Sequence, residues 1–566
     1  MSEGNSEQTF YSAWRFYLVL FILFLIVSGL LWRIVDLAIF DQRFLQQQGN
    51  DRVLRLVSTP AFRGMIIDRN GFPLAVSTTV YSAWINPKEF IPSKDMTSSL
   101  SQILGMKDKE MTGMLKHYQK TKREFIYLKR GLSPEVAKRI KQLNIPGLYT
   151  QEEYRRYYPE GEVAAHVVGF TNIDDHGQEG LELAYNQWLT GEPGKKWAIK
   201  DRLGRVISDV QTLQEQKSGH DLILSLDRRI QYVAYRELLA GVLQNQANSG
   251  SVVVLDVKTG EVLAMVNQPS FNANKRLLAN KDIIRNRAVT DSFEPGSTIK
   301  AFSIASALDS GHFKPDSIID TSPGWIIAGN NKVSDEHNNG PLTVAQILQI
   351  SSNVGTTKML LSLPPDQLWS LLHRVGFGEI TGIGFPGEQS GSLIKHHPWG
   401  AFTLATLSWG YGLSVTAVQL ARAYSVIAND GIKFPISLLR LEKPPIGERV
   451  MDGKVAKEML LLLESVVSAK GATGAQARVP GYRVAGKTGT SNIAKAHGYD
   501  KHRYTSSFVG IAPVSNPRFI VAVIIHDPHG RKHLGGEVSA PVFEKIMEAV
   551  LRIYNVPPDA PENVAA

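Results

Sequence analysis

The sequence predicts an α+β protein with one membrane-anchoring helix near its N-terminus. Residues 52–216 alternate short β-rich runs with helical ones, and from about Gly219 strands stand at both ends of a long helical stretch. Strands at both ends with helices between them are typical of a domain whose sheet is closed by its first and last segments. A length of 566 residues is enough for two or three folded domains.

The first element is an apolar run from Phe16 to Trp32 that has no charged residue and is flanked by arginines. At ~1.5 Å per residue, a helix of this length nearly spans a ~30 Å hydrocarbon core. The run is long for the apolar part of a signal peptide, and no convincing Ala-x-Ala cleavage site follows it. We therefore expect a transmembrane anchor at residues 16–35 after a tail at residues 1–15. A cleaved signal peptide is the alternative.

The next part of the chain, residues 50–217, is expected to form a non-catalytic domain. Two of its stretches stand out, Arg63–Gly71 and Gly177–Glu182. The first ends in Asn70-Gly71 between apolar runs, which is a strong hairpin signal. Neither stretch contains a plausible nucleophile beside a base. We expect buried Arg and Asp pairs and tight turns that hold a platform together.

The remaining part, residues 218–555, is expected to be the catalytic domain, followed by a disordered Pro-rich tail at 556–566. Helices dominate its middle, and alternating or β-branched runs lie near its ends. The elements expected at its two ends are a strand at Leu222–Leu226, a helix at Asp227–Leu239, a hairpin at Ser251–Val266, strands at Thr505–Ala512 and Phe519–His526, and a helix at Pro541–Tyr554.

Three short motifs follow one another in this domain: Ser297–Lys300, Ser351–Asn353 and Lys487–Thr490. They fit the ordered SxxK, SxN and KTG set of serine acyltransferases that recognise penicillin. Ser297 follows a turn and opens an apolar run with helical spacing, so it is expected to share a helix face with Lys300. An ordinary helix N-cap is the alternative role for this serine.

The individual motifs also occur elsewhere, at Ser392–Lys395, Ser270–Asn272 and Lys258–Gly260. None of these repeats completes an ordered triple, because each stands in the wrong place relative to the other two motifs. Lys258–Gly260 also joins the two β-rich runs of the expected hairpin, so a turn is its simplest role.

The three motifs together supply a nucleophile and a base. A serine hydroxyl becomes a good nucleophile when a neighbour takes its proton. Lys300 can take the proton of Ser297 if it is neutral, which requires burial or a nearby cation such as Lys487. Ser351 can relay a proton to the leaving amine, and Asn353 can hold both Lys300 and a substrate amide.

The third motif supplies the binding groups. The strand that begins at Lys487 offers an edge that an extended peptide can join. The N–H groups of Ser297 and Thr490 would form an oxyanion hole. The hydroxyls of Thr488 and Thr490 can bind a carboxylate, and Gly489 lies between them. Taken singly, such residues are often turn formers or surface charges, and their order in the chain favours the joint role.

The composition limits the kinds of partner that the chain is expected to bind. The chain has no cysteine and a formal net charge of +9 with scattered Lys and Arg. These values favour an anionic surface nearby, such as cell wall or lipid headgroups, and no concentrated basic face for nucleic acid is visible. The histidines show no strong ligand pattern, and no phosphate loop precedes a helix. We expect no metal and no cofactor.

On these residues the chain resembles the class B penicillin-binding proteins, and most of all their division-specific septal peptidoglycan D,D-transpeptidases of the FtsI type. The resemblance covers nearly the whole length. The stretches that carry it are Trp32–Leu37, Arg63–Gly64, Asp68–Gly71, Gly177–Glu182, Phe293–Lys300, Asp335–His337, Ser351–Gly355, Trp409–Gly412 and Gly486–Thr490. One place departs from the family pattern: Leu534 stands where an aromatic residue often precedes two glycines.

The resemblance implies an architecture. It implies a short cytoplasmic tail, one transmembrane helix in the bacterial inner membrane, an elongated α/β pedestal of the dimerisation-domain type and a periplasmic transpeptidase domain. The last would share the antiparallel sheet and helices of the serine β-lactamases.

The resemblance also implies an activity. The enzyme would cross-link stem peptides of the septal wall through a Ser297 acyl-enzyme, with release of terminal D-Ala, and β-lactams would bind it. Its partners would be a shape-and-division-family glycosyltransferase and other divisome membrane proteins.

Four alternatives use the same motifs. A class A β-lactamase needs a Glu in an E-x-x-L-N run, and none lies between Asn353 and Lys487. A D,D-carboxypeptidase would pass the acyl group to water, and an elongation-specific class B enzyme would act elsewhere in the wall. A non-enzymatic scaffold or β-lactam sensor should have lost Ser297, Lys300 or Lys487.

Overall fold

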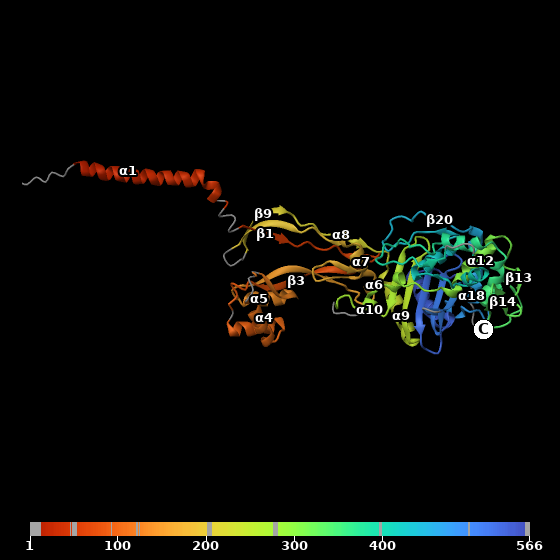
Figure 1. Cartoon of the computed structure of the whole chain (residues 1–566). Helices are drawn as coiled ribbons and strands as arrows, with labels where there is room; N and C mark the ends of the chain where they lie inside the picture. The colour runs from red at the N-terminus through yellow and green to blue at the C-terminus, as the bar shows by residue number, and fades with distance from the viewer. Residues whose placement is uncertain are drawn as a thin grey trace, which may run out of the picture. The chain divides into compact units, whose positions relative to one another are not determined.

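The structure, a computed structural model, divides the chain into two compact units (Figure 1). One unit holds residues of 1–61, 80–153 and 192–217, and the other holds 62–79, 154–191 and 218–566. Parts of the domain expected at residues 50–217 thus belong to each of the two units. The residues that the structure describes are 13–45, 47, 54–91, 93–119, 123, 125–200, 206–275, 281–394, 399–495 and 498–560.

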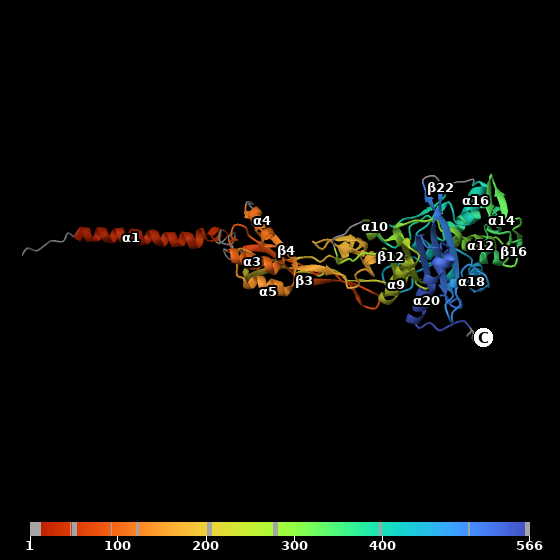
Figure 2. The same ribbon diagram turned by 90° about the horizontal axis from the view of Figure 1, so that it is seen from below.

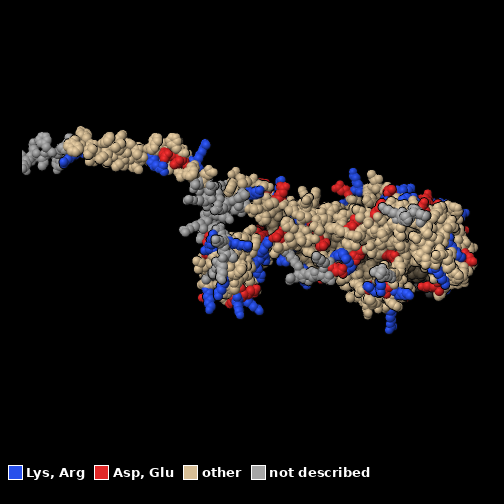
Figure 3. Space-filling model, viewed as in Figure 1, with Lys and Arg blue, Asp and Glu red and all other residues tan. Residues whose placement is uncertain are grey.

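The N-terminal helix α1 (Ala13–Val35) exposes apolar side chains on all sides, and a π-helical turn (Asp36–Phe40) follows it. Figure 3 shows most of this helix as an uncharged surface. In the described part of the chain, the helix over Trp14–Phe40 is the one span long and apolar enough to cross a membrane. Of the expected tail at 1–15, residues 1–12 lie outside the described ones.

The rest of the first unit contains two small sheets. Strands β1 (Leu54–Thr59), β8 (Gly194–Lys200) and β9 (Val206–Gln214) form an antiparallel sheet in the order β1-β8-β9. In the other sheet, residues of β3 (Pro73–Ile85) pair with β4 (Ile126–Leu132). Its core includes residues of three helices and of β3 and β4. These helices are α3 (Lys94–Leu104), α4 (Asp108–Gln119) and α5 (Pro134–Gln142).

Two conspicuous stretches of the predicted pedestal meet in the second unit. Arg63 Nε donates to the Glu182 carboxylate at 2.7 Å, and Arg156 Nε donates to the same carboxylate at 2.6 Å. All three side chains are buried. The expectation of a buried pair is therefore right, although the partner of Arg63 is Glu182 and not an aspartate.

The hairpin predicted at Asn70-Gly71 is confirmed, because β2 (Ile66–Ile67) pairs antiparallel with β3 across this turn. The buried Asp68 carboxylate accepts the N–H groups of Asn70 and Phe72 at 2.8 Å each. It also accepts the N–H of Arg228 at 3.1 Å, at the start of α9 (Arg228–Gln244). Asp68 thus joins this turn to the first helix of the catalytic region.

A five-stranded antiparallel sheet in the order β12-β11-β23-β22-β21 forms the centre of the second unit (Figure 2). Strand β21 is at one edge. Side chains alternate between the two faces, as the period of two of a strand requires: Val253 and Leu255 belong to one core, while Val252 and Val254 belong to the other. The strands are β11 (Ala247–Asp256), β12 (Val262–Gln268), β21 (Ala485–Lys495), β22 (Gly498–Ala512) and β23 (Phe519–Pro528).

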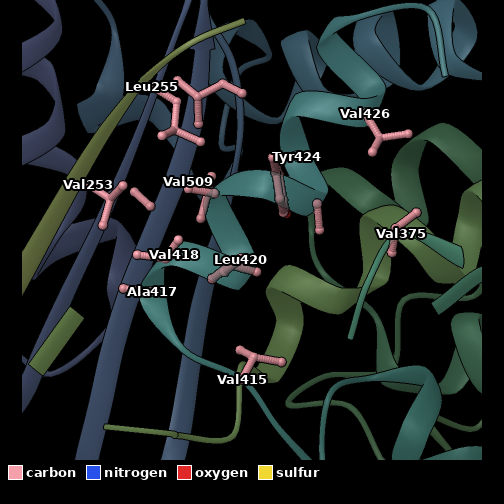
Figure 4. Close-up of a cluster of buried hydrophobic side chains, with 14 of the residues drawn as sticks. Val253, Leu255, Val375, Val415, Ala417, Val418, Leu420, Tyr424, Val426 and Val509 are labelled. Atoms are coloured by element: carbon pink, nitrogen blue, oxygen red, sulfur yellow. The ribbon is translucent and has the colours of Figure 1, made fainter. Parts of the chain in front are cut away.

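Helices cover both faces of this sheet. Helices α9 and α20 (Ala540–Ile553) pack on one face (Figure 2). On the other face, α17 (Ala417–Ala428) packs its apolar side chains, including Val418 and Tyr424, between the sheet and further helices (Figure 4). Those further helices include α12 (Lys300–Asp309), α15 (Pro365–Arg374) and α18 (Gly453–Ser468).

Shorter elements complete this unit. They are β5 (Leu148–Tyr157, shared by both units), α6 (Ala165–Val168), β6 (Phe170–Thr171), β7 (Gly177–Glu179), α7 (Gly180–Ala184), α8 (Asn186–Leu189), β10 (Leu222–Ile223), α10 (Lys281–Ile284), α11 (Arg287–Thr290), β13 (Ile318–Asp320), β14 (Trp325–Ala328), β15 (Asn331–Ser334), β16 (Pro341–Thr343), α13 (Val344–Gln349), α14 (Asn353–Leu361), β17 (Ser392–Leu393), α16 (Ala401–Ser408), β18 (Leu413–Ser414), β19 (Ile432–Lys433), β20 (Glu448–Arg449) and α19 (Gly535–Val538).

One expectation about the C-terminus is corrected. Residues 556–560 of the expected disordered tail are held by hydrogen bonds: Asp559 accepts the N–H groups of Arg483 at 2.7 Å and Ser515 at 3.0 Å, and Ala560 N–H donates to the Gly481 carbonyl at 3.1 Å. These hydrogen bonds hold the segment in place, although its Pro-rich composition is typical of disorder. Residues 561–566 lie outside the described part of the chain.

Candidate active site

Ser297 lies in a 3₁₀ turn (Gly296–Ile299) that runs directly into α12. The sequence predicted a helix that opens at Ser297, but the α-helix begins at Lys300. Gly296 permits the tighter turn because its φ is 56°, a value that residues with a Cβ rarely adopt. A Cβ on Gly296 would stand 2.9 Å from the Thr490 carbonyl oxygen. The turn that carries Ser297 therefore lies directly against strand β21.

The same turn is fastened to the buried core. The Tyr424 hydroxyl, from α17, donates to the Thr298 carbonyl at 2.7 Å, and the Thr298 hydroxyl donates to the Pro295 carbonyl at 2.8 Å. Tyr424 and Thr298 are both fully buried. Ser297 itself is only partly buried, so its hydroxyl is held at the surface of the cleft by a fixed backbone.

Lys300 brings the first two motifs together. Its Nζ donates to the Ser351 carbonyl oxygen at 2.5 Å, to Ser351 Oγ at 3.2 Å and to Asn353 Oδ1 at 2.6 Å. The side chain is fully buried. Burial, reinforced by the positive charge of Lys487 and opposed by Asp335, lowers the pKa of Lys300 well below its ordinary value.

The second motif lies at the start of helix α14. Ser351 has a φ of 63°, which turns its carbonyl toward Lys300. Ser352 is the N-cap of the helix, and its hydroxyl accepts the Gly355 N–H at 2.9 Å. Asn353 is the first residue of α14, so its side chain projects from a well-fixed helix end.

Asp335 fixes this helix end, although no separate role was predicted for this residue. Its carboxylate accepts the Ser352 hydroxyl, the Asn353 N–H at 2.6 Å and the Val354 N–H at 3.0 Å. A carboxylate is stabilised at a helix N-terminus by these unpaired N–H groups. Asp335 directly follows β15, and no short motif marks it. Only its place in a stretch that resembled the family pointed to it.

Lys487 contributes a second buried amine from strand β21. Its Nζ donates to the Thr488 hydroxyl at 3.2 Å and to the Thr488 carbonyl at 3.3 Å. Burial lowers the pKa of Lys487 to about 7. The Thr488 hydroxyl in turn donates to Thr473 Oγ1 at 3.2 Å.

Gly489 allows β21 to approach the turn that carries Ser297. A Cβ on Gly489 would stand 2.3 Å from Ser507 Oγ and 2.8 Å from the Pro295 carbonyl oxygen. Thr490 follows, and its hydroxyl accepts the Gly535 N–H at 3.0 Å. Gly535 and its neighbour Leu534 form the rim where the aromatic residue of the family pattern is missing.

The predicted residues surround one cleft of about 790 Å³. Ser297, Ser351 and Asn353 line it from one side, and Thr488 and Thr490 line it from the strand. Lys300 and Lys487 are buried beneath them. The lining that the sequence did not predict includes Glu336, His337, Thr473, Gln476 and Glu537.

The repeats of the single motifs lie elsewhere. Ser392 is in strand β17, where its hydroxyl bonds with that of Ser414 at 3.0 Å, and Lys395 lies outside the described residues. The Ser270 hydroxyl donates to the Glu162 carbonyl at 2.7 Å. Lys258–Gly260 is the turn between β11 and β12, as predicted.

The profile of the penicillin-binding protein transpeptidase domain matches residues 250–548, and that of the penicillin-binding protein dimerisation domain matches residues 58–224. The chain belongs to the penicillin-binding proteins. Its transpeptidase profile covers the whole cleft, from the turn of Ser297 to the rim at Gly535.

Known proteins are similar to this chain along nearly its full length. The peptidoglycan D,D-transpeptidase FtsI of Escherichia coli is 41% identical over 98% of this chain and 94% of its own. The probable peptidoglycan D,D-transpeptidase PenA of Neisseria meningitidis is 39% identical over 98% of this chain and 95% of its own. Among solved structures, a peptidoglycan synthetase from Bifidobacterium adolescentis is 27% identical, with a TM-score of 0.71 over 90% of this chain and 99% of that one.

A second solved structure holds an antibiotic. Penicillin-binding protein 3 of Mycobacterium tuberculosis, complexed with aztreonam, is 28% identical, with a TM-score of 0.69 over 89% of this chain and 99% of that one.

These findings confirm several predictions. The family, the α+β fold with its transpeptidase domain and the enzyme class, a serine-type D,D-transpeptidase of peptidoglycan, are as the sequence predicted. Peptidoglycan as substrate and β-lactams as ligands follow from the family. The apolar helix α1 together with the FtsI relatives indicates a single-pass inner membrane protein.

Proposed function

We propose that this penicillin-binding protein cross-links stem peptides of the septal wall through an acyl-enzyme on Ser297. The observation that carries the proposal is the buried Lys300 amine, which bonds to Ser351 and Asn353 one helical turn from Ser297. Burial lowers the pKa of this lysine and so favours the neutral amine, which can act as a base.

In the first half-reaction, Lys300 takes the proton of the Ser297 hydroxyl as Oγ attacks the carbonyl carbon of the penultimate D-Ala. The N–H groups of Ser297 and Thr490 bind the oxyanion. The C–N bond then breaks, and the leaving amine takes the proton from Lys300 by way of the Ser351 hydroxyl. Terminal D-Ala leaves, Ser297 holds the donor as an ester, and Lys300 is neutral again.

The donor is held by the third motif. Its terminal carboxylate binds the hydroxyls of Thr488 and Thr490, with the charge of Lys487 beneath them. The peptide joins the free edge of β21 as an added strand. Gly489 has no role with the substrate in this scheme: it lets the strand lie close to the turn of Ser297.

The second half-reaction gives the acyl group to an amine. Lys300 takes the proton of the acceptor amine, nitrogen attacks the ester carbonyl, and the C–O bond breaks with return of the proton to Ser297. Water competes poorly, because no E-x-x-L-N run supplies a further base between Asn353 and Lys487. The ester therefore persists until an amine arrives.

The place of action follows from the substrate. Stem peptides lie outside the inner membrane, so residues 218–555 act in the periplasm, residues 50–217 form the pedestal and residues 1–15 stay in the cytoplasm. The FtsI relatives favour the septum, with a shape-and-division-family glycosyltransferase and other divisome membrane proteins as partners. An elongation-specific role is the second candidate, because it needs the same site.

The test is the fate of the donor. The full chain, in a membrane with an active glycosyltransferase partner and lipid-linked precursor, should yield more cross-linked dimers than trimmed tetrapeptide monomers. A product pool dominated by tetrapeptide monomers would contradict transfer and support a D,D-carboxypeptidase. Absence of both products alongside retained β-lactam binding would support a sensor.

A further inference from the structure

A second cavity adjoins the active-site cleft. It has a volume of about 550 Å³ and lies among α9, the loop after β23, α19 and α20, which is within the size range of small-ligand sites. Gln476 and Glu537 line both this cavity and the cleft. The two hollows are therefore separated by a single wall of side chains.

The proposed mechanism places the acceptor on this side. The terminal carboxylate of the donor binds Thr488 and Thr490, so the leaving D-Ala lies at the Thr488 end of the cleft. The acceptor amine attacks the same carbonyl carbon and must enter where the leaving amine departed. Beside Thr488 lies Thr473, at 3.2 Å between their hydroxyl oxygens, and the cleft lining there continues to Gln476 and Glu537.

The charge of the lining changes from negative to positive between the cleft and the second cavity. Glu537 stands at the wall, and the lining beyond it includes Arg531, Lys532 and Lys545. The other carboxylate there, Glu237, is already paired: one oxygen lies 2.6 Å from Arg236 and the other 3.7 Å from Lys545. Arg531 and Lys532 form no ion pair with another described residue and are exposed, so their charge is open to a ligand.

We propose that this cavity is the acceptor subsite, which takes an acidic stem peptide that bears a free amine. Glu537 attracts the ammonium end at the wall, and Arg531 with Lys532 binds the carboxylates of the same peptide in the cavity. Both contacts position the acceptor. The ammonium loses its extra proton to water before the attack, and the proton released on attack goes to Lys300 as in the proposed function. The inference rests on the proposed function, because it needs the donor to be bound along β21.

The test separates acceptor from donor. A thioester donor acylates the full-length enzyme, and transfer is followed to two acceptors: D-alanine, too small to reach the cavity, and an acidic stem tetrapeptide with a free side-chain amine. In the double variant Arg531→Ala with Lys532→Ala, KM for the tetrapeptide should rise about tenfold, since two charge contacts are lost. KM for D-alanine should change by less than about twofold. High salt should raise the wild-type KM for the tetrapeptide toward that of the variant.

The matched control removes the same charges elsewhere. Arg552 and Lys258 are exposed on the same unit and line neither hollow, so Arg552→Ala with Lys258→Ala should leave both KM values at wild type. An equal rise for both acceptors, a rise in KM for the donor, or the same effect in the control pair would overturn the subsite. Failure of the proposed function has a different signature: the thioester would then leave no acyl group on Ser297 even in the wild type.

Discussion

At the residue scale, the site depends on the protonation state of Lys300. Burial, reinforced by the charge of Lys487 and opposed by that of Asp335, disfavours the ammonium form, and oxygens of Ser351 and Asn353 hold its nitrogen in place. A neutral amine accepts a proton, whereas an ammonium cannot. The rate of acylation by a β-lactam should therefore rise with pH through the lowered pKa of Lys300, whereas above about pH 7 the loss of charge on Lys487 should weaken binding of the ligand carboxylate.

Lys300→Arg tests the same point. A guanidinium keeps its proton at any accessible pH, so the variant holds a fixed positive charge in place of the neutral amine and should not be acylated at any pH. The measurement is the pH profile of the acylation rate, with the thermal midpoint as a check on folding. A rate near wild type in Lys300→Arg would rule out the role of base.

Asp335 offers a second test at this scale. Asp335→Asn can keep one oxygen for the N–H groups of Asn353 and Val354, but its N–H₂ group then faces the Ser352 hydroxyl, which loses the oxygen to which it donates. An unsatisfied buried donor costs about 1–3 kcal/mol, so the start of α14 should shift and the acylation rate should fall by about tenfold or more. Asp320→Asn is the matched control, because Asp320 also accepts a backbone N–H, that of Ser322 at 2.8 Å, away from the cleft. Equal acylation rates in the two variants would show that Asp335 does not position the site.

The motif residues could be read from the sequence because their order in the chain is distinctive. Asp335 and Glu537 could not, because each is one acidic residue in a loop or short helix, and only folding brings it to the cleft. The type of turn at Ser297 was not predictable either. The helical spacing after Ser297 was evident, but the 3₁₀ turn depends on the approach of β21 to Gly296, which no local sequence pattern indicates.

At the element scale, the close contact between β21 and the turn of Ser297 builds the cleft. Gly489→Ala would place a methyl group 2.3 Å from Ser507 Oγ and 2.8 Å from the Pro295 carbonyl oxygen. Overpacking of this kind costs about 1–3 kcal/mol, and here it pushes the strand away from the nucleophile. We expect a lower thermal midpoint and a large loss of acylation.

Gly113→Ala serves as the control for this glycine change. Gly113 lies inside α4 with nothing within 4 Å of an added Cβ, so the substitution should stabilise by about 0.5–1 kcal/mol and leave acylation intact. Wild-type acylation in Gly489→Ala would show that the spacing of strand and turn is not critical.

The longer elements were predictable because their periodicity is strong. The hairpin β11–β12, strand β23 and helices α9 and α20 are where the sequence placed them, with ends that differ by a few residues, whereas β22 begins at Gly498 and not at Thr505. The contribution of residues 62–79 and 154–191 to the second unit was not predictable. It depends on pairs distant in sequence, such as Arg63 with Glu182 and Asp68 with the start of α9.

At the scale of the whole molecule, one apolar helix crosses the membrane once, so the two ends of the chain lie on opposite sides. A periplasmic reporter fused after Tyr554 should be active, and the same reporter fused before Phe10 should be silent. Recovery of a soluble chain that lacks about the first thirty residues would support a cleaved signal peptide instead.

The central claim is that Ser297 carries the acyl group. The most direct measurement is mass spectrometry of the full chain after incubation with a β-lactam, with the adduct mapped to a peptide. We expect one long-lived adduct on the Ser297 peptide, its complete loss in Ser297→Ala and its retention in Ser392→Ala, whose serine lies in β17 and outside the cleft. An adduct that survives Ser297→Ala, or one that maps to another serine, would contradict the account.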